Sequence, residues 1–471
     1  MQPLHVDNKK IVDSAGNPVY LRGTCIGSWL NKENFLTGFL GTDLVMTRTM
    51  YQELGKERAD AFFKTYHDVF ITDADFRYLS SIGMNVVRIA VNYRFFEDDM
   101  NPFQYRPEGF HYLDKAVAFG RAHGIYIILD LHALPGGQNY RWHSDNNSGS
   151  ALLWEHRDFQ KRAIALWKHI AQHYKDEPVI AGYDLINEPE APDLHVLRDF
   201  YEELIAAIRS AGDRHIIFLE GNNRGNDFDG LDELSDENVA YSSHNYNYVT
   251  LQARSYPGQC CGRKVNADVL EQIFKRRNHW MLERNLPSWC GEFSTFFDGG
   301  ILNPTVQDFA RLSALRDQLL IFNRYDQHWT IWTYKDIGHE GLVCTDPASE
   351  YYRRISPLQT IKRELSLEPF LDRKIGGVFA DVQNIIQKTA RSVALNYHDY
   401  SLEYDSLIKS MGEQSICCRI TETLAPLYAN AFSDMTADEI VSMVKEAFSF
   451  EHMLQREPLE EVLRTALQTN D

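Results

Sequence analysis

The segment Ile180-Ala-Gly-Tyr-Asp-Leu-Ile-Asn-Glu-Pro189 decides the fold. It is a mostly apolar run that stops abruptly at Asn187-Glu188, with Pro189 directly behind. Such a run predicts a buried strand that carries a carboxylate at its end. Asn, Glu and Pro also commonly close strands in surface turns, so this segment alone favours a turn over a functional site.

A second segment changes that balance. Leu286-Pro-Ser-Trp-Cys-Gly-Glu292-Phe293 is again a short apolar strand that ends in a single Glu. Two carboxylates on separate strands of a β/α chain are what hydrolysis of a glycosidic bond requires, because one acid protonates the leaving oxygen and one carboxylate meets the sugar cation. We therefore interpret Glu188 and Glu292 as such a pair.

Strand and helix signals alternate along most of the chain, which predicts an α/β fold with a parallel sheet. Amphipathic stretches such as 72–82, 158–174 and 268–283 separate the strands, and several end in a glycine just before the next strand. Eight strands are expected, the number that closes a (β/α)8 TIM barrel. They are residues 19–27, 85–91, 126–132, 180–188, 216–221, 239–246, 287–293 and 328–334.

Both ends of the chain carry additional elements. Residues 4–21 predict a β-hairpin whose turn is Asp13-Ser-Ala-Gly16-Asn-Pro18, positioned to cover the bottom of the barrel. We divide the chain into a (β/α)8 catalytic domain, residues 1–365, and a helical C-terminal extension, residues 366–471. Helices in the extension are expected at 378–393, 402–424, 437–448 and 458–467, and Thr436-Ala-Asp-Glu439 is a capping box.

The apolar faces of these C-terminal helices must be buried. We expect them to pack on the barrel and to stabilise the enzyme without taking part in its chemistry. Self-association as a homo-oligomer is the alternative. A carbohydrate-binding module is a weaker third reading, because all eight Trp lie before position 333 and none is left to form an aromatic platform in the extension.

Composition limits the function. The 471 residues carry 48 Lys and Arg against 66 Asp and Glu, a net charge of −18, which argues against binding to nucleic acid or to an anionic membrane. A neutral substrate fits better. The first residues lack the basic and apolar regions of a signal peptide, so a cytoplasmic location is expected, with secretion after processing as the alternative.

No cofactor or metal is expected. The seven Cys are odd in number and include the adjacent pairs Cys260-Cys261 and Cys417-Cys418, which do not suggest a disulfide framework. Cys and His nowhere have the spacing of a zinc site, and His143 and Asp145 look like parts of a polar loop.

The chemistry of a barrel lies at the carboxyl ends of its strands. Taken singly, each polar or aromatic group there has an ordinary explanation, such as a core ion pair for Arg88 or a structural role for the histidines. Their convergence with two carboxylates is harder to explain in that way. The groups are Arg88, His132, Asn187, Glu188, His244, Tyr246, Glu292 and Trp332.

These residues resemble glycoside hydrolase family 5, within the clan of retaining (β/α)8 glycosidases. The resemblance covers roughly residues 4–365, and its most specific motifs are Asn187-Glu188-Pro189 and Gly291-Glu292-Phe293 in that order. Two loops, Leu131-His-Ala-Leu-Pro-Gly-Gly-Gln-Asn139 and Gly27-Ser-Trp-Leu-Asn-Lys-Glu33, are most similar to those of the exo-β-1,3-glucanases. Residues 140–145 lengthen the first loop, and Gly27-Ser28 stands where those relatives have Gly-Gly.

The resemblance implies a retaining β-glycosidase with double displacement. Glu292 is then the nucleophile, kept ionised by Arg88 and Tyr246, and Glu188 is the general acid and base, able to hold its proton near neutral pH. The other expected roles are binding of the sugar 2-hydroxyl by Asn187, orientation of the acid and of hydroxyls by His132 and His244, glucose binding in a closed pocket by Glu33, and a floor for the −1 subsite formed by Trp332. A cis peptide bond is expected between Trp332 and Thr333.

Exo-action on β-glucosides or β-gluco-oligosaccharides is the first interpretation of the substrate. An endo-acting β-1,4-glucanase or mannanase is the alternative. A non-catalytic glycan-binding barrel is disfavoured because both carboxylates are present. A metal-dependent or phosphate-handling barrel would show carboxylate ligands on successive strands or a glycine-rich loop late in the barrel, and the sequence has neither.

Overall fold

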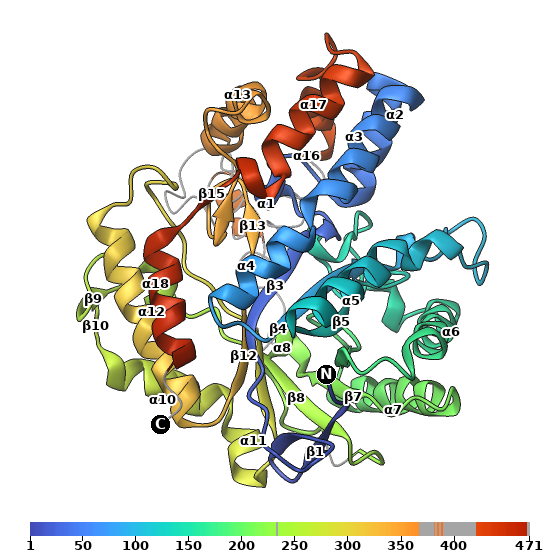
Figure 1. Cartoon of the computed structure of the whole chain (residues 1–471), viewed down its shortest axis with the longest axis vertical. Coiled ribbons are helices and arrows are strands. Elements are labelled where there is room, and N and C mark those ends of the chain that lie inside the picture. Colours follow the sequence, from blue (N-terminus) through green and yellow to red (C-terminus); the bar gives the residue numbers. More distant parts are fainter. Residues whose placement is uncertain are drawn as a thin grey trace.

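The computed structural model is a closed barrel of eight parallel strands surrounded by helices (Figure 1). It describes residues 1–231, 234–365 and 421–468, together with residues 367, 381, 384, 385, 388 and 389. The predicted (β/α)8 fold is confirmed. The strands follow one another around the barrel in chain order, as β3 (Arg22–Leu30), β4 (Val86–Asn92), β5 (Tyr126–Ala133), β6 (Ile180–Asp184), β7 (Ile216–Glu220), β8 (Val239–His244), β11 (Ser288–Glu292) and β12 (His328–Ile331).

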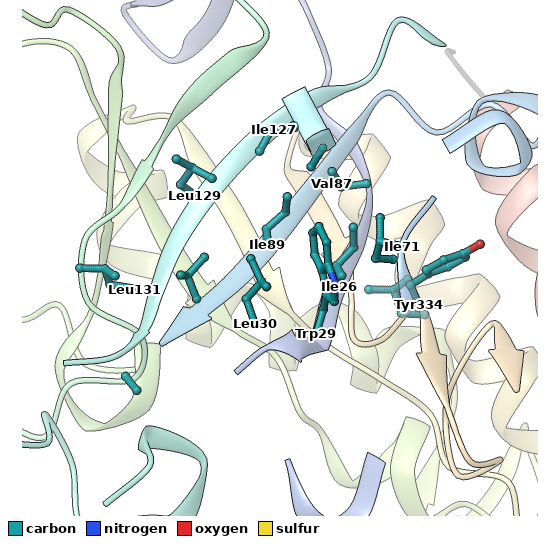
Figure 2. Packing of buried hydrophobic residues seen from close by; sticks show 14 of the residues in the cluster. Ile26, Trp29, Leu30, Ile71, Val87, Ile89, Ile127, Leu129, Leu131 and Tyr334 are labelled. Carbon is teal, nitrogen blue, oxygen red and sulfur yellow. The ribbon is translucent and has the colours of Figure 1, made fainter. Parts of the chain in front are cut away.

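Successive side chains along each strand point alternately into the barrel interior and outward, into the layer under the helices. In β4, Val86 packs inside the base of the barrel, and Arg88 points into the interior above it. Val87 and Ile89 belong instead to the large outer core, where they pack with side chains of β3 and β5 (Figure 2). This alternation brings the polar residues at the strand ends into one central layer.

The helices that connect the strands agree with the amphipathic pattern. One predicted helix, 268–283, is divided into two at Asn278, which ends one helix and begins the next. The crossover helices are α4 (Asp73–Ser81), α5 (His111–His123), α6 (Arg157–Tyr174), α7 (Leu194–Ser210), α10 (Ala267–Arg277), α11 (His279–Arg284) and α12 (Val306–Arg324), and α13 (Glu350–Glu364) follows the last strand.

A helical excursion that the sequence pattern did not predict lies between β3 and β4. After the short α1 (Asn34–Thr37), the helices α2 (Asp43–Leu54) and α3 (Lys56–Phe70) project from the barrel and pack against α16 (Thr421–Asn430) and α17 (Ala437–Phe448) (Figure 1). Aromatic contacts such as Phe62 with Phe432, at 5.8 Å between ring centroids, hold the two pairs together. The buried Nζ of Lys335 joins them to the barrel, because it donates to the carbonyls of Phe70 and Phe448.

Helix α18 (Glu457–Gln468) packs on the barrel between α12 and α4. Asn323 of α12 donates to the carbonyl of Ala466 at 2.7 Å, and Tyr78 of α4 donates to Glu460 at 2.6 Å. Helix α12 is the seventh crossover helix and α4 is the first. Helix α18, which lies between them, therefore occupies the place of the eighth helix of the barrel.

The helices expected at 437–448 and 458–467 are therefore confirmed as α17 and α18. Most of each of the helices expected at 378–393 and 402–424 lies outside the described residues. The domain boundary at residue 365 stays a prediction.

The N-terminal hairpin covers the bottom of the barrel, as expected. Leu4 of β1 (Leu4–Asp7) and Ile11 of β2 (Lys10–Asp13) pack against the residues that fill the base, Trp289 among them. The predicted turn at residues 13–18 is present: Val12 and Pro18 form an antiparallel bridge across it, and Asp13 accepts from the backbone of Ala15 and Asn17. A further turn that the pattern did not predict joins β1 to β2 at Asn8, which has a φ of 55°. Within the described part of the chain, no helix combines the length and hydropathy needed to cross a membrane.

Candidate active site

Glu188 and Glu292 face each other at the carboxyl ends of β6 and β11. One side-chain oxygen of each, together with one ring nitrogen of His244, lie within 4.8 Å of one another. This separation favours the retaining arrangement, with carboxyl groups about 5–5.5 Å apart, over the inverting one of about 6.5–9.5 Å. The predicted strand 180–188 ends early, at Asp184, and Glu188 has a φ of 48°, a left-handed conformation that is uncommon for a residue other than glycine.

Glu292 is held by a cation and a hydroxyl. Arg88 Nη1 donates to Oε1 at 2.6 Å, and the Tyr246 hydroxyl donates to Oε2 at 2.8 Å. Burial raises the pKa of Glu292, but the positive charges of His244 and Arg88 outweigh burial and hold the pKa below its usual value. The carboxyl group is therefore ionised, as a nucleophile must be.

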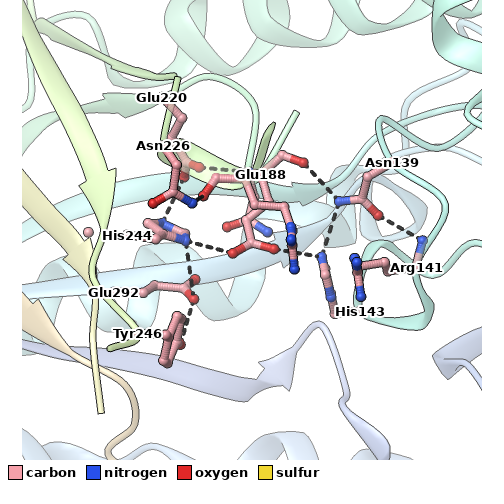
Figure 3. A network of polar contacts seen from close by, with 12 residues as sticks. Asn139, Arg141, His143, Glu188, Glu220, Asn226, His244, Tyr246 and Glu292 are labelled. Carbon is pink, nitrogen blue, oxygen red and sulfur yellow. Dashed lines mark hydrogen bonds and ion pairs between the residues drawn. The ribbon is translucent and has the colours of Figure 1, made fainter. Parts of the chain in front are cut away.

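Glu188 has a histidine on each oxygen (Figure 3). His244 Nδ1 lies 2.9 Å from Oε1, and His143 Nε2 lies 3.3 Å from Oε2. Burial raises the pKa of Glu188, but hydrogen bonds with these histidines outweigh it and hold the pKa well below its usual range. This direction is opposite to the expectation that Glu188 holds its own proton near neutral pH.

The pKa of His244, the partner of Glu188, moves in the opposite direction. Burial lowers the pKa of His244, but the carboxylates of Glu220, Glu292 and Glu188 outweigh it and raise the pKa well above its usual value. His244 and Glu188 therefore share one proton across their 2.9 Å contact.

Arg88 contacts more carboxylates than the sequence pattern indicated. Besides Glu292, its fully buried guanidinium lies within 3.2 Å of three other carboxylates, those of Asp130, Asp184 and Glu220. Burial, together with the charge of Glu220, raises the pKa of Asp184 well above its usual value. The sequence did contain a signal for these three acids, because each is an acidic residue at an inward-facing position of an otherwise apolar strand. Asp130, for example, stands two residues before His132.

His132 and Trp332 form the opposite side of the site. His132 lies 2.7 Å from Asp130 and 3.1 Å from Glu33, and burial lowers its pKa while these two acids outweigh burial and raise it to about 10. Its ring stacks on Trp332, with 5.3 Å between centroids. A side chain at Gly27 would meet the Trp332 ring at 2.8 Å, which explains the glycine there.

One further expectation for this side is confirmed, whereas the sugar-binding roles of Asn187, Glu33 and Trp332 stay predictions. The peptide bond between Trp332 and Thr333 is cis. Ser28 has a φ of 60°, in the left-handed region that favours glycine, and its Oγ accepts from the backbone of Glu33 at 3.1 Å. Asn187 accepts from Arg88 at 2.8 Å. The structure thus brings all nine predicted site residues together.

Two functional candidates were missed. His143 was assigned to a polar loop, yet its ring reaches Glu188. Glu340, in the loop after β12, is buried and accepts from Ser294 Oγ at 2.5 Å. Burial raises the pKa of Glu340 well above its usual value, and the charges of Asp336, Glu33 and Glu292 add to the effect. Nothing in the local sequence marked either residue, because their proximity to the site depends on loop conformation.

Arg456, which follows the short strand β15 (Leu454–Gln455), fastens the loops that carry Glu340. Strand β15 pairs with β14 (Val343–Cys344), which pairs with β13 (Lys335–Asp336). The buried guanidinium donates to the carbonyls of Gly338 and Gly341, on either side of Glu340, and to that of Gly300 after β11, at 2.9 to 3.0 Å. It also lies 3.8 Å from the ring centroid of Phe297.

Within the described ranges, Glu188, His244 and Glu292 are the one set of side chains close enough together to surround a cation. The arginine on Glu292 and the histidines on Glu188 already balance both carboxylates. We therefore assign no metal to the site.

Comparisons with known proteins agree with this geometry. Residues 50–338 match the cellulase family (glycosyl hydrolase family 5). The chain is 35% identical over 471 residues to a β-xylosidase of Phanerodontia chrysosporium, covering 98% of each protein. It is 31% identical over 237 residues to a probable glucan 1,3-beta-glucosidase A of Emericella nidulans, covering 48% of this chain and 57% of the relative.

A solved structure supports the fold alone. The crystal structure of an endogalactoceramidase superposes with a TM-score of 0.52 at 19% identity, over 71% of this chain and 75% of the other.

Proposed function

Because this chain belongs to glycoside hydrolase family 5, we propose that it is a retaining, exo-acting β-glycosidase in which Glu292 is the nucleophile and Glu188 the acid and base. The observation that carries the proposal is the contrast between the two facing carboxyl groups. Glu292 is fixed by a cation and a hydroxyl, whereas Glu188 shares a proton with histidine.

In the first step, Glu292 attacks the anomeric carbon while Glu188 delivers a proton to the leaving oxygen. The shared proton on His244 Nδ1 is returned to Glu188 as the bond to the leaving group breaks. Arg88 and Tyr246 keep the attacking oxygens of Glu292 in place before the reaction. In the second step Glu188 takes a proton from water, and the water replaces Glu292 at the sugar.

Exo-action is supported by a junction between two loops beside the carboxyl pair. Asn31, after β3, donates to the backbone carbonyl of His143 in the loop after β5 at 3.0 Å. Asp145 of the same loop accepts from the backbone of Leu44 at 2.8 Å. A polymer running through the site on this side would have to cross these contacts.

Terminal β-xylose is the substrate to test first, because the β-xylosidase relative matches over nearly its whole length. Terminal β-glucose is the second, on the basis of the similarity to the probable glucan 1,3-beta-glucosidase. An endo-acting enzyme is the remaining alternative, and an endoglucanase C of Acetivibrio thermocellus is 25% identical over 59% of this chain and 88% of the relative.

The test is a panel of 4-nitrophenyl β-glycosides beside polymeric xylan, β-glucans and mannan. We expect release of single sugars from aryl β-xyloside or β-glucoside, with the β-anomer as first product by proton NMR. Labelling with the matching 2-deoxy-2-fluoro glycoside should modify Glu292. A rapid loss of polymer viscosity with little monosaccharide would contradict exo-action, and the α-anomer would contradict the mechanism.

A further inference from the structure

His143 is placed so that one ring nitrogen meets two different partners. Its Nε2 lies 3.3 Å from Glu188 Oε2 and 3.1 Å from Asn139 Nδ2. A ring nitrogen carries either a proton or a lone pair, so it serves one of these partners at a time. With a proton, Nε2 donates to a carboxylate; without one, it accepts from an amide.

The orientation of Asn139 is fixed by other bonds. Its Oδ1 accepts from the backbone of Arg141 at 2.9 Å, and its Nδ2 donates to the carbonyl of Glu188 at 3.0 Å. The side facing His143 is therefore the amide nitrogen, whose second proton is available as a donor. Figure 3 shows Asn139, His143 and Glu188 in this arrangement.

The two histidines on Glu188 differ in what surrounds them. The second nitrogen of His244 lies 3.1 Å from Glu220, and the side chain is 1% exposed. His143 belongs to the lengthened loop, and its side chain is 12% exposed, which lets the ring exchange a proton with water. The backbone around it is held by Asn31 and by Asp145.

We propose that His143 is a positioning residue for the acid and base Glu188: its Nε2–H donates to the carboxylate form, and when Glu188 is protonated the Nε2 proton leaves to water and the freed lone pair accepts from Asn139. This inference rests on the proposed function, in which Glu188 alternates between the two forms during each turnover. Since a partner is ready for each form, the carboxyl group keeps its place through both steps.

Several other charged groups surround the pair. Glu188 is faced by His244 from β8, Glu220 from β7 and Glu292 from β11. The ring of His143 lies 6.0 Å from that of His132, and its charge also acts on Glu33. A substitution at His143 leaves all of these side chains in place.

The test is the pH dependence of kcat/KM for His143→Ala. Loss of a donor to the carboxylate makes Glu188 and His244 hold their shared proton more tightly, so the basic limb of the profile, which reports loss of that proton, should move up by about one pH unit. At the optimum, phenyl β-glycoside should lose about tenfold in kcat/KM, whereas the 2,4-dinitrophenyl β-glycoside, which needs little acid assistance, should change by less than about threefold.

Two further variants separate positioning from loop damage. His143→Gln keeps an amide donor at the place of Nε2 and should return the basic limb towards the wild-type position. Ser144→Ala removes a bond within the loop, from Oγ to the carbonyl of Arg141, without touching Glu188, and should leave the limb in place.

An unmoved limb in His143→Ala, with equal losses on both substrates, would overturn the inference. The proposed function would survive that result as long as the fluoro glycoside still labels Glu292 in the wild-type enzyme. Labelling of another residue would instead refute the proposed function itself.

Discussion

At the scale of single residues, the site depends on how charge is distributed around Arg88. Its guanidinium is fully buried, and four carboxylates lie within 3.2 Å of it. One cation cannot balance four anions in a dry interior, and burial together with the charge of Glu220 raises the pKa of Asp184, which favours its neutral form. The charge of Arg88 is then free to act on Glu292.

The roles of the two catalytic candidates can be separated by azide rescue. Glu188→Ala should lose about 10²–10⁴-fold on poor leaving groups but far less on activated ones, and azide should restore turnover with a β-glycosyl azide as product. Glu292→Gly should lose activity on all substrates, and azide should give the α-azide. Product stereochemistry by NMR is the measurement. An α-azide from the Glu188 variant would reverse the assignment.

Glu340 gives a prediction about pH. Its pKa is raised in the folded protein, so the stability it contributes is full below the unfolded pKa of about 4.3 and is lost as pH rises through the folded pKa. Glu340→Gln removes this loss. Its melting temperature should therefore exceed that of the wild type increasingly as pH rises from about 5 to 8.

The matched control is Glu461→Gln, which changes an exposed glutamate of α18 by the same atoms. Its melting curve should follow the wild type at every pH. A Glu340→Gln variant that tracks the wild type in the same way would contradict a buried, proton-bearing acid at position 340.

At the scale of elements, the short sheet of β13, β14 and β15 carries Arg456 to the loops above the barrel. Arg456→Ala leaves three carbonyls without their donor and removes the contact with Phe297. We expect a loss of about 2–4 kcal/mol in the free energy of unfolding and a higher KM, because the Glu340 loop loosens. Denaturant titration and steady-state kinetics measure the two effects.

Two comparisons make this prediction specific. Arg456→Lys keeps the charge but not the planar fork, so its stability should lie between wild type and Ala. Arg464→Ala, at a half-exposed pair with Glu460, should cost less than about 1 kcal/mol. Equal losses in the free energy of unfolding for the alanine variants at positions 456 and 464 would show that the contacts of Arg456 do not stabilise the protein more than an ordinary surface ion pair does.

The elements also show what sequence reasoning reaches. The eight strands were predictable, since each is a local apolar run with a polar residue at its end. The excursion of α2 and α3 was not, because their apolar faces are covered by α16 and α17, which lie far away in the sequence. The nine site residues stand at strand ends or in recognisable motifs, whereas His143 and Glu340 are brought to the site by loop contacts that no local pattern encodes.

At the scale of the whole molecule, α18 completes the ring of helices around the barrel. Leu463 is fully buried in this helix, which packs against α12. Leu463→Ala should lower the free energy of unfolding by about 2–5 kcal/mol, whereas Glu461→Ala on the exposed side should change it by about 0.5 kcal/mol or less. Denaturant unfolding compares the two.

Truncation after Phe448 removes β15, Arg456 and α18 together, and should give insoluble or unfolded protein. A soluble, folded truncated enzyme with full turnover would show that α18 is dispensable. A soluble, folded one without turnover would show that the segment acts on the active site through Arg456.

The place of α18 has a consequence for synthesis. Strand β12 ends at Ile331, but the helix that covers the seam between α12 and α4 begins only at Glu457. While the ribosome translates the intervening residues, all eight strands have been made and the apolar seam is still open. Domains fold as units, and an apolar surface that is still exposed is prone to aggregation. The nascent chain is therefore most dependent on chaperone binding during this interval. A stop codon after Glu340 in that interval would leave a barrel with all eight strands and every active-site carboxylate, but without its eighth covering helix.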